Sequence, residues 1–285
     1  YLFLTPRGEK MSWIDMVYEY DGSYEGFLCC IFESYVNRDF PIAFACNEEF
    51  PVLSLYSVRS VETDLSHSSR ILRSITERSP RAARLLYRAF HTCMDNREAC
   101  LSRFVQKLYA DGPQFLRRPS DDACFPLYKA VRHLSGELEK LRGFVRFSDY
   151  SGVLGAEIRP KNRVLPFLRR YFCERYANES FFLYDRTHGE LLLYSGGRSR
   201  IVQADSLTLA PPDEQEAQYH RLWKAFFDTV AIEDRRNERC QNTFLPKRYR
   251  STMTEFQSEA AFIPEASPAD ASLPSAPNGP PAPEI

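Results

Sequence analysis

The residues best suited to chemistry gather near the C-terminal end of the chain, between Ile232 and Arg250. From Arg221 to Arg250 the chain carries eight Lys or Arg residues and four Asp or Glu residues. Arg and Lys contact phosphates, Asn and Gln can pair with base edges, and Tyr can stack on an exposed base. The segment therefore predicts a nucleic-acid surface formed by Arg235, Asn237, Gln241, Lys247, Arg248 and Tyr249.

The same segment also has a purely structural interpretation. Arg235 and Arg239 can form surface ion pairs with acids such as Glu233 and Asp234, and such pairs contribute little to binding or stability. Asn237 and Gln241 can cap the ends of helices. Composition alone leaves both interpretations open.

A second candidate site lies in the segment from Asp185 to Gly189, between two apolar stretches. Asp185, Arg186 and His188 could place a carboxylate, a cation and a titratable imidazole together, which is a set that acid–base catalysis uses. Asp185 and His188 are thus the predicted catalytic pair, and Arg186 is a predicted contact to nucleic acid. Asp and Gly are also common turn formers, so a plain hairpin turn with an exposed His188 is the alternative.

A further nucleic-acid candidate is Arg146, in a short apolar stretch predicted to be a strand. Val145 and Phe147 would share one face of that strand, so Arg146 would point away from them, toward solvent or a bound phosphate. No metal site is predicted. The eight cysteines include neither the CxxC pairs of a zinc site nor the CxxxCxxC of a radical SAM cluster.

Length and composition limit the class of protein. With 285 residues, 44% hydrophobic and 14% aromatic, the chain can bury a sizeable core. The net charge of −1 means that affinity for nucleic acid must come from local patches. No apolar run approaches the ~18 residues that span a bilayer, and charged residues near the start argue against a signal peptide. We therefore expect a cytoplasmic protein that does not bind membranes.

The elements that must position these residues follow from periodicity. Residues 16–20 favour a strand, and residues 21–23 favour a turn with a helix cap. The apolar positions from Phe27 to Tyr35 then recur at helical spacing and predict a helix. A short extended stretch is predicted at 52–56. Helices are predicted between Asp64 and Leu108, with Ser79 and Pro80 opening one of them, and from Leu127 to Gly143.

The pattern then changes from helical to extended. Strands are predicted at 144–147, 153–158, 181–184 and 191–194, with a helix from Pro166 to Tyr176 between the two pairs. The last helix spans about 214–232 and carries an aromatic face, which suits it for docking. The predicted fold class is α+β, with a helical layer, a small antiparallel sheet of order strand-strand-helix-strand-strand, and a C-terminal docking helix.

The predicted domain organisation has three parts. Residues 1–15 are interpreted as a leader or upstream read-through. Residues 16–256 form a single α+β domain, with a helix-rich half at 16–142 and a sheet-containing half at 143–256. Residues 257–285 are rich in Pro, Ala and Ser and lack basic residues, so they predict a disordered acidic tail.

Four motifs resemble a known but uncharacterised family of DNA-metabolism proteins. They are YDGSYEGFL at Tyr20–Leu28, GFVRF at Gly143–Phe147, LYDRTHG at Leu183–Gly189, and IEDRRNERCQNTFLPKRY at Ile232–Tyr249. Their order and spacing fit the family from about residue 16 to residue 256. The family usually has a His-Arg pair in the helix before GFVRF, where this chain reads Glu139-Lys140-Leu141-Arg142.

The resemblance implies a role in DNA repair or DNA modification without establishing a reaction. Members of the family accompany a radical SAM protein and occur beside, or fused to, a uracil-DNA glycosylase-like domain. The resemblance therefore implies DNA, a radical SAM protein and a glycosylase-like protein as partners. It implies no cofactor in this chain, because the iron–sulfur cluster and SAM would belong to the partner. The glycosylase motifs themselves are absent from this sequence.

Three functional hypotheses follow. The preferred one is an accessory DNA-binding protein that works with the radical SAM partner through the basic segment. The second is an enzyme acting directly on DNA or a nucleotide, with Asp185 and His188 as acid and base and Arg146 holding a phosphate. The third is a protein-interaction scaffold, in which the aromatic helix face and the acidic tail contact the partner. The sequence does not decide whether the chain is an enzyme.

Overall fold

The computed structural model describes residues 12–46, 56–204, 206–207, 213–232 and 237–257. The fold is α+β, as the sequence predicts. The chain divides into two compact units: residues up to 143 together with 159–175 form the first, and 144–158 together with the chain from 176 onward form the second. Each unit contains its own sheet.

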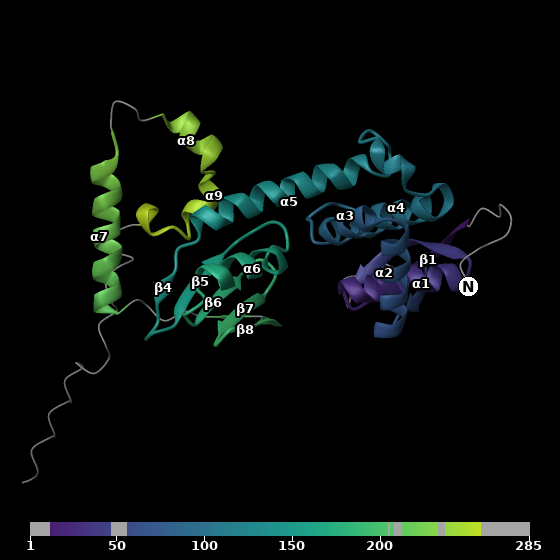
Figure 1. The fold of residues 1–285 in the computed structure, drawn as a ribbon, viewed down its shortest axis with the longest axis horizontal. Helices are drawn as coiled ribbons and strands as arrows, with labels where there is room; N and C mark the ends of the chain where they lie inside the picture. Colours follow the sequence, from purple (N-terminus) through teal and green to yellow (C-terminus); the bar gives the residue numbers. More distant parts are fainter. Residues whose placement is uncertain (1–11, 47–55, 205, 208–212, 233–236, 258–285) are drawn as a thin grey trace, which may run out of the picture. The chain divides into compact units, whose positions relative to one another are not determined.

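The first unit combines a parallel sheet with a helical layer (Figure 1). β1 (Ser12–Tyr20) lies between β2 (Asp39–Cys46) and β3 (Ser57–Ser60) and runs parallel to both. α1 (Tyr24–Val36) connects β1 to β2. The remaining helical elements of this unit are α2 (Leu65–Arg78), α3 (Pro80–Phe90), α4 (Arg97–Asp111), the 3₁₀ helix η2 (Pro113–Arg117), α5 (Phe125–Phe144) and α6 (Leu165–Arg175).

The predicted turn between the first strand and the first helix is present. Ser23 caps α1 by accepting a hydrogen bond from the Gly26 amide at 2.9 Å. Asp21 accepts from the Ser23 amide at 2.9 Å and from the Thr63 hydroxyl at 2.8 Å. Gly22 has φ +77°, and a side chain at Gly26 would collide with the Asp21 carboxylate. The motif YDGSYEGFL therefore encodes a strand, a tight turn and a capped helix.

Helices predicted between Asp64 and Leu108 are confirmed as α2, α3 and α4. Ser79 caps α3, and Pro80 occupies its first turn, where a missing amide proton costs nothing. β2 has no counterpart among the elements predicted from the sequence. Of the expected extended stretch at 52–56, only residue 56 lies within the described residues, and β3 starts at Ser57.

The second unit is built on a mixed sheet in the order β4-β5-β6-β7-β8. Neighbouring strands are antiparallel except β5 and β6, which run parallel. The strands are β4 (Ser148–Asp149), β5 (Leu154–Ile158), β6 (Phe181–Asp185), β7 (Glu190–Ser195) and β8 (Arg198–Gln203).

The predicted antiparallel sheet is thus wrong in one pairing, because a crossover that contains α6 returns the chain in the same direction between β5 and β6. The stretch 144–147 is not a strand either: α5 continues to Phe144, and the strand begins at Ser148. β8 has no counterpart in the prediction. It carries two exposed arginines, Arg198 and Arg200, and charged side chains are common on edge strands.

The C-terminal part of the second unit is helical. It contains α7 (Glu214–Val230), α8 (Glu238–Phe244), α9 (Lys247–Arg250) and the 3₁₀ helix η4 (Thr254–Phe256). The predicted last helix is confirmed as α7, and its aromatic face is largely exposed. The expected leader falls mostly on residues 1–11, and nearly all of the expected tail falls on 258–285, which lie outside the described residues.

No helix in the described part of the chain has the length and apolar character needed to cross a membrane.

Candidate functional site

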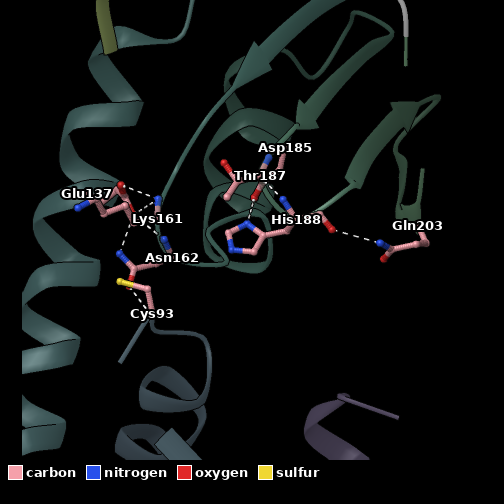
Figure 2. A network of polar contacts seen from close by, with 8 residues as sticks. All are labelled: Cys93, Glu137, Lys161, Asn162, Asp185, Thr187, His188 and Gln203. Atoms are coloured by element: carbon pink, nitrogen blue, oxygen red, sulfur yellow. Dashed lines mark hydrogen bonds and ion pairs between the residues drawn. The ribbon is translucent and has the colours of Figure 1, made fainter. Parts of the chain in front are cut away.

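The turn between β6 and β7 holds the predicted acid–base pair together (Figure 2). His188 Nδ1 lies 2.7 Å from Asp185 Oδ2. The other carboxylate oxygen of Asp185 accepts hydrogen bonds from the backbone amides of Thr187 at 3.0 Å and His188 at 3.2 Å. The Asp185 carboxylate is fully buried, whereas 16% of the His188 side chain is exposed. Three donors therefore hold one buried carboxylate in place.

The sequence explains this arrangement locally. Asp185 is the last residue of β6, and its side chain closes the turn by accepting from the two following amides, as Asp does in turns. Gly189 completes the turn with φ +63°. The Gln203 side chain donates to the His188 carbonyl at 3.1 Å, which ties the turn to the end of β8 (Figure 2).

A carboxylate bound to Nδ1 fixes the orientation of an imidazole and leaves Nε2 to exchange protons. Nε2 of His188 has no hydrogen-bond partner among the described residues. The pair is thus arranged as an acid–base group could be. An Asp185 that only closes the turn would make the same hydrogen bonds. The hydrogen bonds alone therefore fit both interpretations of this segment, an acid–base pair and a plain hairpin turn.

Arg186 points to a different neighbour. Its guanidinium lies 3.5 Å from the Glu157 carboxylate, and 58% of its side chain is exposed. The Arg186 amide donates to the Ile158 carbonyl at 3.1 Å, next to the parallel pairing of β5 and β6. An ion pair this long and exposed contributes little, so the guanidinium remains accessible to a phosphate.

Arg146 is engaged inside its own unit. Its guanidinium donates to both oxygens of Glu255, at 2.7 and 3.3 Å, and lies 5.6 Å from the centre of the Trp223 ring. Trp223 Nε1 donates to the same carboxylate at 3.2 Å. The Glu255 side chain is 2% exposed. A phosphate could bind Arg146 only by competing with a buried carboxylate, so this geometry does not favour the predicted phosphate contact.

The basic C-terminal segment is only partly described. Arg235 lies outside the described residues. Asn237 caps α8 by accepting from the Cys240 amide at 2.9 Å, which is the structural role that the sequence left open for it. Gln241 and Lys247 are exposed, and their side chains have no partner among the described residues. Arg239, on the same segment, is also exposed and has no ion pair with another described residue, while Glu233 and Asp234, its expected partners, lie outside the described residues.

Tyr249 serves as an anchor rather than as an exposed ring. It is 3% exposed, and its ring centre lies 5.6 Å from that of Phe144. Arg248 stacks over the Tyr249 ring at 4.5 Å and hydrogen-bonds its hydroxyl group. In this structure Tyr249 is therefore not available to stack on a base. Its burial instead fixes α9, and with it the neighbouring basic side chains.

Sequence reasoning missed a cluster of Ser148, His220 and Glu216. His220 Nε2 lies 2.9 Å from Ser148 Oγ and 2.8 Å from Glu216 Oε1. These are the residue types of a Ser-His-Glu triad, but a triad needs the acid on Nδ1 and the nucleophile on Nε2. Here both partners contact the same nitrogen, so the carboxylate does not orient the imidazole toward Ser148. The i,i+4 spacing of Glu216 and His220 on one helix was the available sequence clue.

A second missed cluster lies in the first unit, around Glu137 (Figure 2). This carboxylate is 1% exposed and accepts from the amides of Lys161 and Asn162 and from the Asn162 side chain, at 2.6 to 3.2 Å. Asn162 Oδ1 accepts from the Cys93 amide at 3.0 Å. The cluster joins the loop before α6 to α5 and to the turn that follows α3. A Glu on the apolar face of a predicted helix was its sequence clue.

No group of three or more His, Cys, Asp and Glu side chains within the described ranges is placed to hold a metal ion.

The chain also matches a known protein family. Residues 95–255 match a family described as a domain of unknown function (DUF4130). The match begins just before α4 and ends at η4, so it includes the turn of Asp185 and His188 and the segment of α8 and α9. Neither the curated proteins nor the solved structures contain a match to this chain.

Proposed function

The chain belongs to the DUF4130 family, and because that family's domain has no assigned function, we propose from the residues themselves that this member is an accessory DNA-binding protein. Its contact with DNA is the basic segment of α8 and α9. The role is electrostatic, with phosphate contacts supplying the affinity. Following the resemblance of the four motifs, the protein works with a radical SAM partner, which supplies the iron–sulfur cluster and SAM, in DNA repair or modification.

One observation carries this proposal. Arg239, Gln241 and Lys247 are exposed on α8 and α9, and none of them is used in an ion pair within the described residues. An exposed cation binds a phosphate better than a cation held by a buried carboxylate, because a weak surface ion pair costs little to break. The buried ring of Tyr249 holds α9 against Phe144, so the neighbouring Lys247 is presented from a fixed element.

Fluorescence anisotropy with labelled single- and double-stranded DNA, across a salt series, tests the proposal. We expect binding at about 50 mM salt whose log affinity falls linearly with log salt, with a slope of about 0.9 for each phosphate contact on duplex DNA. Absence of binding to either form at low salt would rule out the DNA-binding role. Binding that does not respond to salt would rule out the phosphate-contact mechanism.

A second candidate function, docking of the partner protein on α7, is favoured by the exposed apolar face of that helix. Tyr219, Leu222, Phe226 and Val230 recur at helical spacing and are between 56% and 66% exposed. Contiguous exposed apolar side chains on a soluble domain mark interaction surfaces. Arg221 lies beside this stripe, exposed and without an ion pair in the described chain, so the partner surface should be apolar with an acidic edge.

Docking on α7 is tested by mixing the protein with its purified radical SAM partner and measuring the mass of the complex by light scattering after size exclusion. We expect a complex with the wild type and none with Leu222→Asp/Phe226→Asp. Gln215→Asp/Gln218→Asp adds the same charge to exposed polar positions of α7 and should leave the complex intact. A complex that survives the apolar-face variant would overturn this candidate, as would a wild-type protein whose α7 face pairs two copies instead.

A further inference from the structure

A small hollow in the first unit lies between the start of α3 and η2. Its walls are formed by Ser79, Arg81, Pro113, Gln114, Leu116 and Arg117, and its volume is about 250 Å³. These residues come from a helical layer that is separate from the basic segment of α8 and α9 in the chain. Only Ser79 among them was singled out from the sequence, and that was as the start of a helix.

The charge of this hollow is uncompensated. Two arginines are among the residues that line it, and no Asp or Glu is. Arg81 contacts a neutral group, the Tyr128 hydroxyl, at 3.2 Å, and Arg117 has no hydrogen bond or ion pair through its side chain within the described residues. Two cations facing one small space repel each other unless an anion lies between them. The arrangement is therefore suited to binding an anion.

Arg81 is held in place before any ligand arrives. Its guanidinium lies 5.9 Å from the centre of the Tyr128 ring, and the Tyr128 hydroxyl donates to the Leu116 carbonyl at 3.2 Å. Tyr128 of α5 thus connects the first turn of α3 to η2, the two walls of the hollow. A guanidinium positioned in advance loses less conformational freedom on binding than a free one.

From these contacts we propose that the hollow binds the terminal phosphate of a nucleotide or of a DNA strand. Arg forms paired hydrogen bonds with phosphate oxygens, and Gln114 adds amide donors. Two guanidinium groups match a phosphate monoester, which carries about two negative charges at neutral pH, better than the single charge of a backbone diester. Pockets for drug-sized ligands span about 300–1,000 Å³, and this smaller space is of a size that suits a phosphate group.

This inference depends on the proposed DNA-binding function in one respect only: that function is the reason for taking a DNA end as the ligand. The test compares a 3′-labelled oligonucleotide that carries a 5′ phosphate with the same oligonucleotide carrying a 5′ hydroxyl. We expect the wild type to prefer the phosphorylated strand by roughly tenfold or more, as one or two charge-assisted hydrogen bonds would give. Arg81→Ala/Arg117→Ala should reduce the preference to about one, and inorganic phosphate should compete it away.

Arg84→Ala/Arg118→Ala is the matched control, because both side chains are exposed, lie near the hollow in sequence and do not line it. It should keep the preference. The single variant Arg117→Ala guards against misfolding, since that side chain contributes no hydrogen bond to the described fold, and circular dichroism should match the wild type. Equal affinity for both oligonucleotides in the wild type, or a preference that survives Arg81→Ala/Arg117→Ala, would overturn the site.

The two proposals fail separately. If neither oligonucleotide binds, the DNA-binding function fails, and calorimetric titration of inorganic phosphate into the wild type then decides the site. Phosphate binding that Arg81→Ala/Arg117→Ala abolishes would support an anion site for a free nucleotide. No phosphate binding would reject it. If DNA binds through α8 and α9 without preference for a phosphorylated end, the DNA-binding function stands and the site is rejected.

Discussion

His91 should make the stability of the first unit depend on pH. It is 8% exposed, packs against Tyr24, Tyr87, Phe90 and Phe167, and its Nδ1 lies 2.8 Å from the Tyr87 carbonyl. Burial lowers the pKa of His91 from 6.5 to about 4, and nearby arginines act in the same direction. The folded protein therefore holds the imidazole neutral where the unfolded chain would protonate it.

The sign and size of the effect follow from linkage. Above pH 6.5 both states are neutral at His91, and no stability is lost. As the pH falls from 6.5 toward about 4, the unfolded chain binds a proton that the folded chain does not, so the free energy of unfolding decreases. At ~1.4 kcal/mol per pH unit, the largest possible loss is roughly 3 kcal/mol.

The comparison is between wild type and His91→Gln, which keeps a hydrogen-bond donor for the Tyr87 carbonyl but does not titrate. Urea unfolding between pH 7 and pH 4 should show the wild type losing up to roughly 3 kcal/mol relative to the variant, because every other group titrates equally in both. NMR titration should give His91 a pKa well below 6.5. Parallel losses in the two proteins, or an ordinary pKa for His91, would refute the reasoning.

Three further variants test the packing around the two units, each by denaturant unfolding. Gly26→Ala should lower the free energy of unfolding by about 1–2 kcal/mol, because the new methyl group collides with the Asp21 carboxylate. This collision outweighs the gain in helix propensity, which is at most about 1 kcal/mol. Unchanged stability would contradict the close approach of Gly26 and Asp21. Arg146→Ala should lose about 3 kcal/mol by leaving Glu255 buried without its cation, and adding Glu255→Gln should recover part of that loss. Leu222→Ala should change stability by less than about 0.5 kcal/mol, since 66% of the residue is exposed, and a larger loss would place α7 in a core.

Local features of the fold could be predicted from the sequence. Ser23 and the pair Ser79-Pro80 mark helix starts through short-range hydrogen bonds and fixed dihedral angles, which need no knowledge of the rest of the chain. Strand direction could not be predicted in the same way. The parallel pairing of β5 and β6 depends on where α6 returns the chain, and the apolar pattern of a strand is the same in either direction.

In the candidate site, too, local contacts could be predicted from the sequence and long-range contacts could not. Asp185 and His188 are three residues apart, so the turn itself brings them together, and the sequence could reveal the pair. The partner of Arg146 is Glu255, 109 residues away, and its burial decides whether the cation is free. The hollow of Arg81 and Arg117 likewise depends on tertiary packing through Tyr128. Contacts of this kind leave no mark in local periodicity.

The salt dependence of DNA binding in wild type and Arg239→Ala/Lys247→Ala tests the central claim most directly. Removing two phosphate contacts should lower the slope of log affinity against log salt by about 1.8, whereas Arg198→Ala/Arg200→Ala, an equal charge change on the exposed edge of β8, should leave it unchanged. A slope that is the same in all three proteins would contradict the assignment of α8 and α9 as the DNA surface.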